Sequence, residues 1–518
     1  MQTMIIMIKR GERMKRKRPA AKIAGEDAAR GAGREVARTS STLPPPVAQS
    51  RKSSGTAADN SGLDGSDASM DNKKRDDIVR LRNVHVLREG EFAEQDLWFS
   101  KSFRRGERAP GSQSVGSEIL NDAKRFYEAS TEKEYAANGT IDGRGLYACP
   151  GFIDLQINGA FGVDFSNPDL SKADVHRVAK GLLHHGVTSF LPTVVTSTQH
   201  VYQQTLPKIR AAMLDQEKSG RAEARILGVH LEGPFISKHK KGAHKEENIR
   251  SELSIQNLYN LYGKAAFESG LIRIITLAPE LPGAAETVRT LAKSHPSIVV
   301  SAGHTQATIS CAEAVVDSGC SMVTHIFNAM SAFHHRDPGL IGLMHFRSPR
   351  VDMGIIVDGI HVHPSAVKMA YNSCADRIFL VTDAMCAMGL PPGLHKLGEL
   401  EVDIVPSEES GVDFKAILRG TKTLAGSVVS MVECVQKFKA FTGCSLQDAI
   451  SAATFAPARA IQELHRRGNL NFGSRADFLL IDPEMLVVKG AFINGECVVG
   501  DFRVLYSEAK RAMERNCS

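Results

Sequence analysis

The sequence has no apolar run approaching the roughly 18 residues needed to cross a bilayer, so we expect no membrane span. Its nine cysteines are odd in number and form no C-x-x-C pair, which speaks against a zinc ribbon or a secreted disulfide framework. No P-loop is present either. The remaining composition, with 42% hydrophobic and 24% charged residues, is ordinary for a globular protein.

The excess positive charge is confined to the first 75 residues. They hold 16 Lys and Arg against 8 Asp and Glu, a net charge of +8, whereas the remaining chain holds 48 against 50. Because this segment has no aromatic residue, it buries too little apolar area to offset the entropy of ordering. We expect residues 1–75 to be a disordered basic tail, and no nucleic-acid binding by the nearly neutral core.

One short cluster in this tail, Lys15-Arg16-Lys17-Arg18-Pro19, is typical of nuclear import signals. A solvated basic tail that carries no targeting signal is the alternative. The apolar patch Met4–Ile8 is too short for a secretory signal. We therefore expect a cytoplasmic protein, with nuclear import as an open alternative.

Between residues 148 and 465, short apolar runs alternate with helix-like stretches. Eight such strand–helix repeats predict an α/β fold of the (β/α)8 TIM-type barrel class, whose strands are buried on both faces. A doubly wound open sheet would alternate too, but no G-x-G-x-x-G follows the first strand. The expected strands are Phe152–Ile157, Thr188–Pro192, Ile226–Leu231, Ile272–Leu277, Ile298–Ala302, Met322–His325, Met353–Val357 and Ile378–Val381.

Further strand-like segments lie at both ends of the chain. They predict a small flanking β-sandwich built from residues 76–147 and 466–507, followed by a C-terminal tail at 508–518. Residues 103–135 are polar and rich in Gly and Ser, so we expect them to form a surface insertion.

Polar residues stand at or just beyond the carboxyl ends of four of the expected barrel strands, where active sites of such barrels lie. Taken singly, each of these residues has a plainer explanation. A histidine at a strand end is often an ordinary polar residue, and Asp383 could simply be a helix N-cap. Together, two imidazoles and a carboxylate indicate a catalytic site for a divalent metal. The four residues are Glu232, His304, His325 and Asp383.

The segments around these residues resemble the N-acetylglucosamine-6-phosphate deacetylases, a branch of the amidohydrolase superfamily. The matching segments are PGFIDLQING (150–159), GVTSFLPT (186–193), HLEGPFIS with KKGAH (230–244), SAGHTQAT (301–308), THIFNAMS (324–331), VDGIHV (357–362), LVTDAM (380–385) and LAGS (424–427).

The resemblance implies one divalent ion per subunit (Zn, Fe, Mn or Co), with Glu232, His304 and His325 as its ligands. Asp383 would be the catalytic acid–base group. Gln156 and Asn158 stand where many amidohydrolases have an H-x-H pair. These two side chains would either support the site or help to hold a second ion, and both alternatives stay open.

The implied reaction is deacetylation of N-acetyl-D-glucosamine 6-phosphate to D-glucosamine 6-phosphate and acetate. Another N-acylated amine or cyclic amide is the alternative substrate, and a catalytically silent binding barrel is the alternative class. The phosphate would be read by Arg336, reaching into the neighbouring site of a homodimer. The implied substrate contacts are Ala243, His244, Asn328, Ala329, Arg336, His361, Leu424, Ala425 and Gly426.

Deleting residues 1–74 is predicted to leave folding and deacetylation unchanged, because this segment contributes no apolar core. The measurement is the specific activity and melting temperature of the truncated chain beside the full-length chain. A large loss of activity on truncation would show that the tail belongs to the catalytic unit.

Overall fold

The computed structural model describes residues 78–101, 117–120, 137, 139–346, 349–397, 400–407, 414–421 and 424–506. The tails expected at 1–75 and 508–518 lie outside these residues. No helix of the described part is long and apolar enough to cross a membrane.

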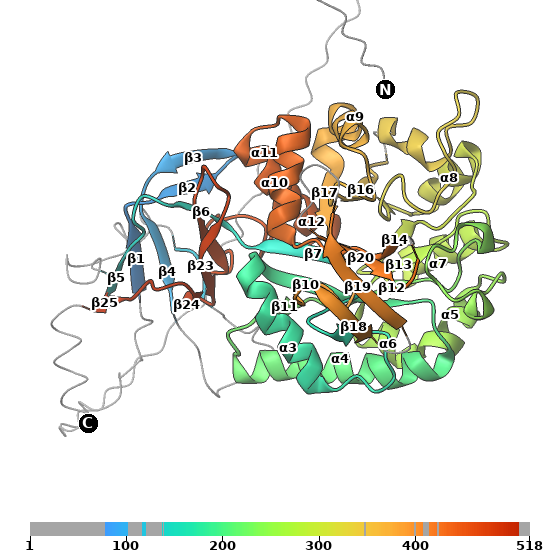
Figure 1. Cartoon of the computed structure of the whole chain (residues 1–518), viewed down its shortest axis with the longest axis horizontal. Helices are drawn as coiled ribbons and strands as arrows, with labels where there is room; N and C mark the ends of the chain where they lie inside the picture. The colour runs from blue at the N-terminus through green and yellow to red at the C-terminus, as the bar shows by residue number, and fades with distance from the viewer. Residues whose placement is uncertain are drawn as a thin grey trace, which may run out of the picture. The chain divides into compact units, whose positions relative to one another are not determined.

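The centre of the described chain is a barrel of parallel strands, which confirms the expected fold (Figure 1). Each strand pairs with the next along the chain, and the short strand β11 (Arg225–Ile226) extends the pairing of β10. The eight barrel strands are β7 (Phe152–Ile157), β10 (Val187–Val195), β12 (Val229–Glu232), β13 (Ile272–Leu277), β14 (Val299–Ala302), β15 (Met322–Val323), β16 (Asp352–Ile356) and β17 (Ile378–Val381).

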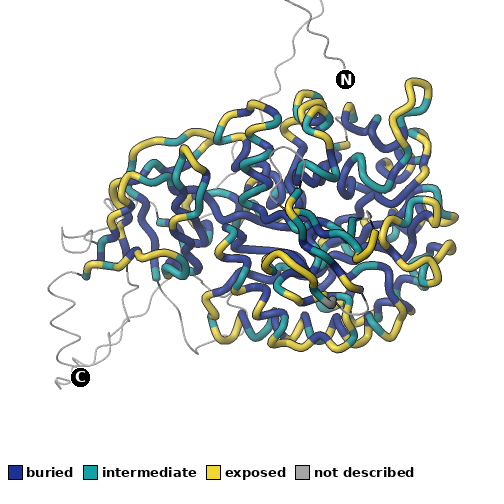
Figure 2. The backbone as a smooth tube through the Cα atoms, in the orientation of Figure 1, coloured by how far each residue is buried: buried dark blue, intermediate teal, exposed yellow. Residues whose placement is uncertain are grey.

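The barrel closes where β17 returns to β7. The Asp383 backbone N–H donates to the Gln156 carbonyl at 2.9 Å, and the Asn158 N–H donates to the Ala384 carbonyl at 2.8 Å. Apart from the partly buried Val195 and Arg273, the barrel strands are buried, whereas the surrounding helices expose their outer faces (Figure 2). This explains the near-continuous apolar runs of the strands.

Helices follow the strands and commonly begin at a Ser or Thr whose side chain caps the first turn. The sixth repeat departs from this rule, because a 3-10 helix (Gly339–His345) takes the place of an α-helix there. The α-helices of the described part are α3 (Lys172–Leu182), α4 (Gln199–Ser219), α5 (Ile255–Tyr262), α6 (Lys264–Glu268), α7 (Ala284–Ser294), α8 (Ile309–Asp317), α9 (Pro364–Cys374), α10 (Met431–Thr442), α11 (Leu446–Ala453) and α12 (Phe455–Ala460).

Two sheets from the chain ends form the sandwich beside the barrel (Figure 1). Their facing side chains share one apolar core, which includes Phe99, Phe478 and Phe492. One sheet has the order β25-β5-β1-β4 and the other β24-β23-β22-β6-β2-β3. The strands are β1 (Ile78–Arg82), β2 (His85–Arg88), β3 (Glu91–Glu94), β4 (Leu97–Ser100), β5 (Gly139–Asp142), β6 (Tyr147–Pro150), β22 (Phe478–Ile481), β23 (Val488–Ile493), β24 (Glu496–Val499) and β25 (Leu505–Tyr506).

Three expectations need correction. The third strand is interrupted near Gly228, where the backbone φ is 132°, and the sixth ends at Val323 instead of His325. Within the segment expected to be a surface insertion, Ile119 is only 1% exposed and belongs to the sandwich core. An isolated apolar residue in a polar segment carries no periodicity, so the sequence pattern did not reveal it.

Two small sheets complete the described fold. A four-stranded antiparallel sheet follows β17, and a two-stranded one follows β7. Their strands are β18 (Gly393–Leu397), β19 (Leu400–Pro406), β20 (Phe414–Leu418), β21 (Leu424–Gly426), β8 (Gly159–Ala160) and β9 (Val163–Asp164).

A buried ion-pair network joins the sandwich to the barrel. The carboxylate of Asp477 accepts from Arg467 and Arg475, each at 3.1 Å, and Arg467 also donates to Ser189 on β10. The Asn494 backbone N–H donates to the same carboxylate at 2.7 Å. These contacts hold the pKa of Asp477 below its usual range despite its burial.

Replacing Asp477 by Ala is predicted to lower the free energy of unfolding by about 3 kcal/mol, because the partly buried Arg467 and Arg475 lose a shared counter-charge. Denaturant unfolding measures this loss. The matched control is Asp501→Ala, whose carboxylate pairs with Arg503 but is 73% exposed; its cost should stay within about 0.5 kcal/mol. Equal effects of the two changes would contradict a structural role for the buried network.

Candidate active site

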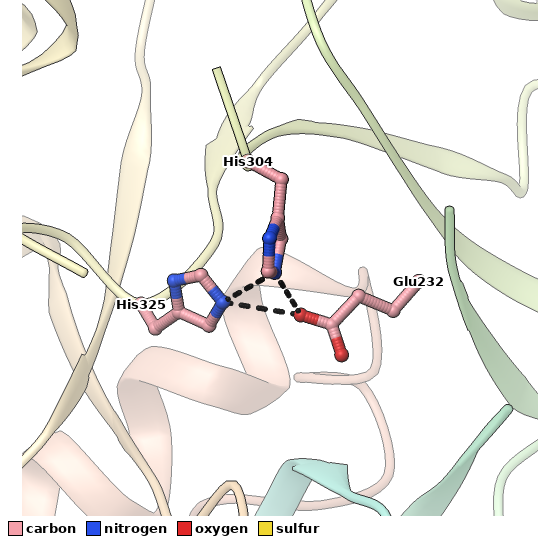
Figure 3. Close-up of side chains that lie close together, drawn as sticks. All are labelled: Glu232, His304 and His325. Carbon is pink, nitrogen blue, oxygen red and sulfur yellow. Dashed lines mark hydrogen bonds and ion pairs between the residues drawn. The ribbon is translucent and has the colours of Figure 1, made fainter. Parts of the chain in front are cut away.

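Three buried side chains meet at the carboxyl ends of the barrel strands (Figure 3). Glu232 is the last residue of β12, and His304 and His325 each stand two residues beyond the end of their strands. Glu232 Oε1 lies 3.1 Å from Nε2 of both histidines, and the two Nε2 atoms lie 3.1 Å from each other. All three residues are at most 4% exposed.

Glu232 and the two histidines shift one another's pKa, and Glu232 is held ionised, as a metal ligand must be. Burial alone would raise the pKa of Glu232, but the two imidazoles outweigh it and hold the pKa well below its usual range. Burial would lower the pKa of His325, yet its contact with Glu232 raises it. His304 Nδ1 contacts the Lys240 carbonyl at 2.8 Å, so Nδ1 carries the hydrogen and a neutral ring offers its Nε2 lone pair.

The spacing of the donor atoms fits a metal ion. Ligand atoms that bind a tetrahedral zinc at about 2.0–2.1 Å lie roughly 3.3 Å apart, and octahedral ligands lie roughly 2.9 Å apart. The three distances of 3.1 Å fall between these values. Two imidazole nitrogens and a carboxylate oxygen are also donors that divalent transition metals accept.

Asp383 lies beside this group, two residues beyond the end of β17. Its Oδ1 accepts from the side-chain amides of Asn158 at 2.8 Å and Gln156 at 3.2 Å. The Gln156 amide also donates to Glu232 at 2.8 Å, so it links the two carboxylates. Burial and the negative charge of Glu232 raise the pKa of Asp383 to about 6.

The backbone at this end of the barrel is strained at several of these positions. Residues other than glycine rarely adopt a positive φ, and such positions concentrate at functional sites. Here φ is 48° at His304, 29° at His325, 49° at Ala329 and 46° at Asp383. Two of these positions carry His304 and His325, whose side chains converge with that of Glu232 (Figure 3).

Several of the residues expected to contact substrate surround this group. The ring centroid of His244 lies 4.4 Å from that of His304, and its Nδ1 lies 2.6 Å from Thr196 Oγ1. Burial and the neighbouring His304 lower the pKa of His244 to about 3, so its ring is neutral. Asn328 donates to the carbonyl of His361 at 3.0 Å.

Strand β21 (Leu424–Gly426), expected to contact the substrate, adjoins the turn that carries Asp383. The Met385 N–H donates to the Ser427 carbonyl at 2.9 Å. Gly426 has a φ of 145°, and a side chain there would crowd Met385 at 3.3 Å. This close approach explains the glycine.

Two of the expected residues are exposed. Ala243 precedes the buried His244, and Arg336 lies in the loop after β15. Among the described residues, the Arg336 guanidinium has no hydrogen-bond or ion-pair partner.

Comparison with known proteins identifies the family. The sequence model of the amidohydrolase family matches residues 147–499. The chain is 39% identical over 430 residues to N-acetylglucosamine-6-phosphate deacetylase of Danio rerio, covering 81% of this chain and 96% of that protein. It is 40% identical over 429 residues to the Homo sapiens protein of the same name, covering 81% and 95%.

The chain belongs to the N-acetylglucosamine-6-phosphate deacetylase family of amidohydrolases. The fold agrees with this membership. A deacetylase structure from Pasteurella multocida superposes with a TM-score of 0.65 at 27% identity, covering 83% of this chain and all of that one. The resemblance noted in the sequence is therefore confirmed.

The sequence patterns of this deacetylase-family chain did not single out two carboxylates that hydrogen-bond to site residues or to their neighbours. Asp154 is fully buried and accepts from the Thr382 hydroxyl at 2.6 Å, next to Asp383. Asp358 lies 2.5 Å from His361 Nδ1. A carboxylate inside an otherwise apolar strand was the available signal for Asp154, and the i, i+3 spacing to His361 was the signal for Asp358.

Proposed function

We propose that this chain hydrolyses N-acetyl-D-glucosamine 6-phosphate to D-glucosamine 6-phosphate and acetate. The observation that carries the proposal is the meeting of Glu232, His304 and His325 beside Asp383 at the barrel mouth. The proposal is also supported by two relatives named N-acetylglucosamine-6-phosphate deacetylase, which match this chain over 96% and 95% of their length. The proposed compartment of this enzyme is the cytoplasm.

Glu232, His304 and His325 would hold one divalent ion, and its identity among Zn, Fe, Mn and Co is open. When bound, such an ion acts as a Lewis acid, which polarises a carbonyl and makes water more acidic. Gln156 and Asn158 donate their amide hydrogens to the carboxylates of the site. We therefore assign them an orienting role.

Asp383 would move the proton. Its carboxylate accepts a proton from the attacking water and later donates it to the departing amine nitrogen, which is a poor leaving group unless protonated. A divalent ion beside Asp383 would favour its ionised form, which the first step needs, whereas burial favours the protonated form, which the second step needs. Asn158 and Gln156 fix the oxygen that they contact.

The remaining residues would bind the sugar phosphate. Neutral His244 presents its Nε2 side toward the acetamide, while Thr196 fixes its Nδ1. His361, oriented by Asp358, and the Asn328–Ala329 turn would contact the sugar, with the backbone of Leu424, Ala425 and Gly426 closing over it. Arg336 would bind the phosphate of the neighbouring subunit's substrate, which requires a homodimer.

Asp383→Asn is predicted to lower kcat by roughly 10² to 10⁴, because the amide keeps the shape but cannot accept a proton. Acetate release from N-acetylglucosamine 6-phosphate measures kcat, and metal analysis of the same sample measures the bound ion. The ion should stay bound, and KM should barely change.

The matched control for that experiment is His304→Ala, which removes one of three ligands and should lose metal and activity together. If Asp383→Asn also releases the ion, Asp383 is a ligand. If Asp383→Asn keeps near-normal kcat, the proposed proton transfer is wrong. Faster turnover of an unphosphorylated acylated amine by the wild-type chain would favour the alternative substrate class.

Arg336→Ala is predicted to raise KM for N-acetylglucosamine 6-phosphate about tenfold to a hundredfold, because a charged hydrogen bond to phosphate contributes about 1.5–3 kcal/mol. Hydrolysis of unphosphorylated N-acetylglucosamine should hardly change. Arg503→Ala, which removes an arginine that is 86% exposed on the sandwich side, is the control and should leave both substrates unaffected.

Mixed dimers test whether Arg336 acts in the neighbouring site. In a dimer of one Arg336→Ala subunit and one Asp383→Asn subunit, a single site would combine a wild-type Asp383 with the partner's wild-type Arg336. Activity well above that of either parent dimer is therefore expected. Activity no greater than the average of the parents would mean that Arg336 serves its own subunit or does not read the phosphate.

A further inference from the structure

A chain of buried hydrogen bonds crosses the barrel interior beneath the proposed metal ligands. Ser301 Oγ lies 2.6 Å from Thr324 Oγ1, which lies 2.7 Å from Thr276 Oγ1. Thr276 Oγ1 in turn lies 2.7 Å from His230 Nε2, and His230 Nδ1 contacts the Leu155 carbonyl at 3.1 Å. The four side chains are at most 3% exposed, and the proposed mechanism uses none of them.

The directions of these hydrogen bonds follow from their end point. The Leu155 carbonyl can only accept, so His230 Nδ1 carries the hydrogen and Nε2 of the neutral ring accepts from Thr276. Thr276 then accepts from Thr324, and Thr324 accepts from Ser301. The two threonine hydroxyls therefore each donate once and accept once. Losing the hydroxyl of Thr276 would leave two buried groups unpaired.

The chain joins the strands that carry the ligands. Three of its members lie just ahead of a ligand in the sequence: His230 before Glu232, Ser301 before His304, and Thr324 before His325. Thr276 lies on β13, which carries no ligand and separates β12 from β14. Its hydroxyl oxygen links His230, on the β12 side, to Thr324, on the β15 side.

The other groups of Thr276 also contact the ligand turns. A Cβ placed on Gly303, the residue before His304, would lie 3.0 Å from Thr276 Cγ2 and 2.8 Å from Thr324 Cβ. The Gly303 backbone is therefore packed closely against both threonines. The Thr276 carbonyl accepts from the Gly233 N–H at 3.2 Å, next to Glu232.

We propose that Thr276 is a positioning residue for the metal centre, whose hydroxyl and methyl groups set the spacing of the three strand ends that carry Glu232, His304 and His325. The inference rests on the proposed function, because it presupposes that these three residues bind a divalent ion. It explains why β13 contributes no ligand and yet directs a polar side chain into the barrel interior.

The test compares Zn²⁺ affinity in full-length chains that have been stripped of metal, measured by competition with a chromogenic chelator. Thr276→Val keeps the branched shape but removes the hydroxyl, and is expected to weaken Zn²⁺ binding about tenfold or more. Thr276→Ser restores the hydroxyl and should recover most of the affinity. For the proposed substrate, kcat should fall in Thr276→Val while KM changes little.

The matched control is Thr205→Val, which removes a buried hydroxyl that bonds only to its own helix at Val201. The melting temperature of each metal-free variant reports the purely structural cost. If Thr276→Val lowers the melting temperature but leaves Zn²⁺ affinity unchanged, the positioning role is overturned. If Thr276→Val does not fold, Ser301→Ala at the head of the chain takes its place, and unchanged affinity there overturns the inference too.

The wild-type chain and His304→Ala separate this inference from the proposed function. If the wild-type chain binds no Zn²⁺, or His304→Ala binds it equally well, the metal site itself is wrong and both proposals fall. If the wild-type chain binds Zn²⁺, His304→Ala does not, and Thr276→Val binds like wild type, the inference about Thr276 alone falls.

Discussion

One carboxylate oxygen of Glu232 faces two histidine nitrogens at the centre of the barrel mouth, and the rest of the site is arranged around that contact. Three donor atoms 3.1 Å apart, all buried, present their electron pairs to one point. Such a group is costly to bury unless a positive charge balances it. A divalent cation provides that charge, which is why the donor set and its electrostatics lead to the same interpretation.

The surrounding structure serves to hold these atoms in place. Parallel strands deliver all the polar side chains to one end of the barrel. The turns that follow adopt positive φ values at His304, His325 and Asp383, a local strain that the closely packed strands below can sustain. Asp154, inside β7, accepts from the Thr382 hydroxyl just beyond β17 and so ties these two strands together where the barrel closes.

Much of this arrangement was predictable from the sequence. The strands Phe152–Ile157, Ile272–Leu277 and Ile378–Val381 have the expected boundaries, because buried parallel strands are continuous apolar runs. Polar residues at the strand ends indicated the site, since barrels place their active sites there. The family resemblance then indicated which of those residues would bind metal, transfer protons or contact the substrate.

Other features depend on tertiary contacts and could not be predicted from sequence patterns. The burial of Ile119 in the sandwich is one example, because a lone apolar residue has no periodicity. The bridge made by Thr276 is another, since a threonine is ordinary in a strand until its hydroxyl is seen between His230 and Thr324. Contacts between strands far apart in sequence decide these roles.

The central claim is that Glu232, His304 and His325 together hold one divalent ion. Crystals of protein purified without added metal, measured at the absorption edges of Zn, Fe, Mn and Co, test it most directly. The account predicts one anomalous peak per subunit, about 2.0–2.2 Å from Glu232 Oε1 and from Nε2 of both histidines. An ion bound elsewhere, or one that takes Asp383 as a ligand in place of a histidine, would contradict it.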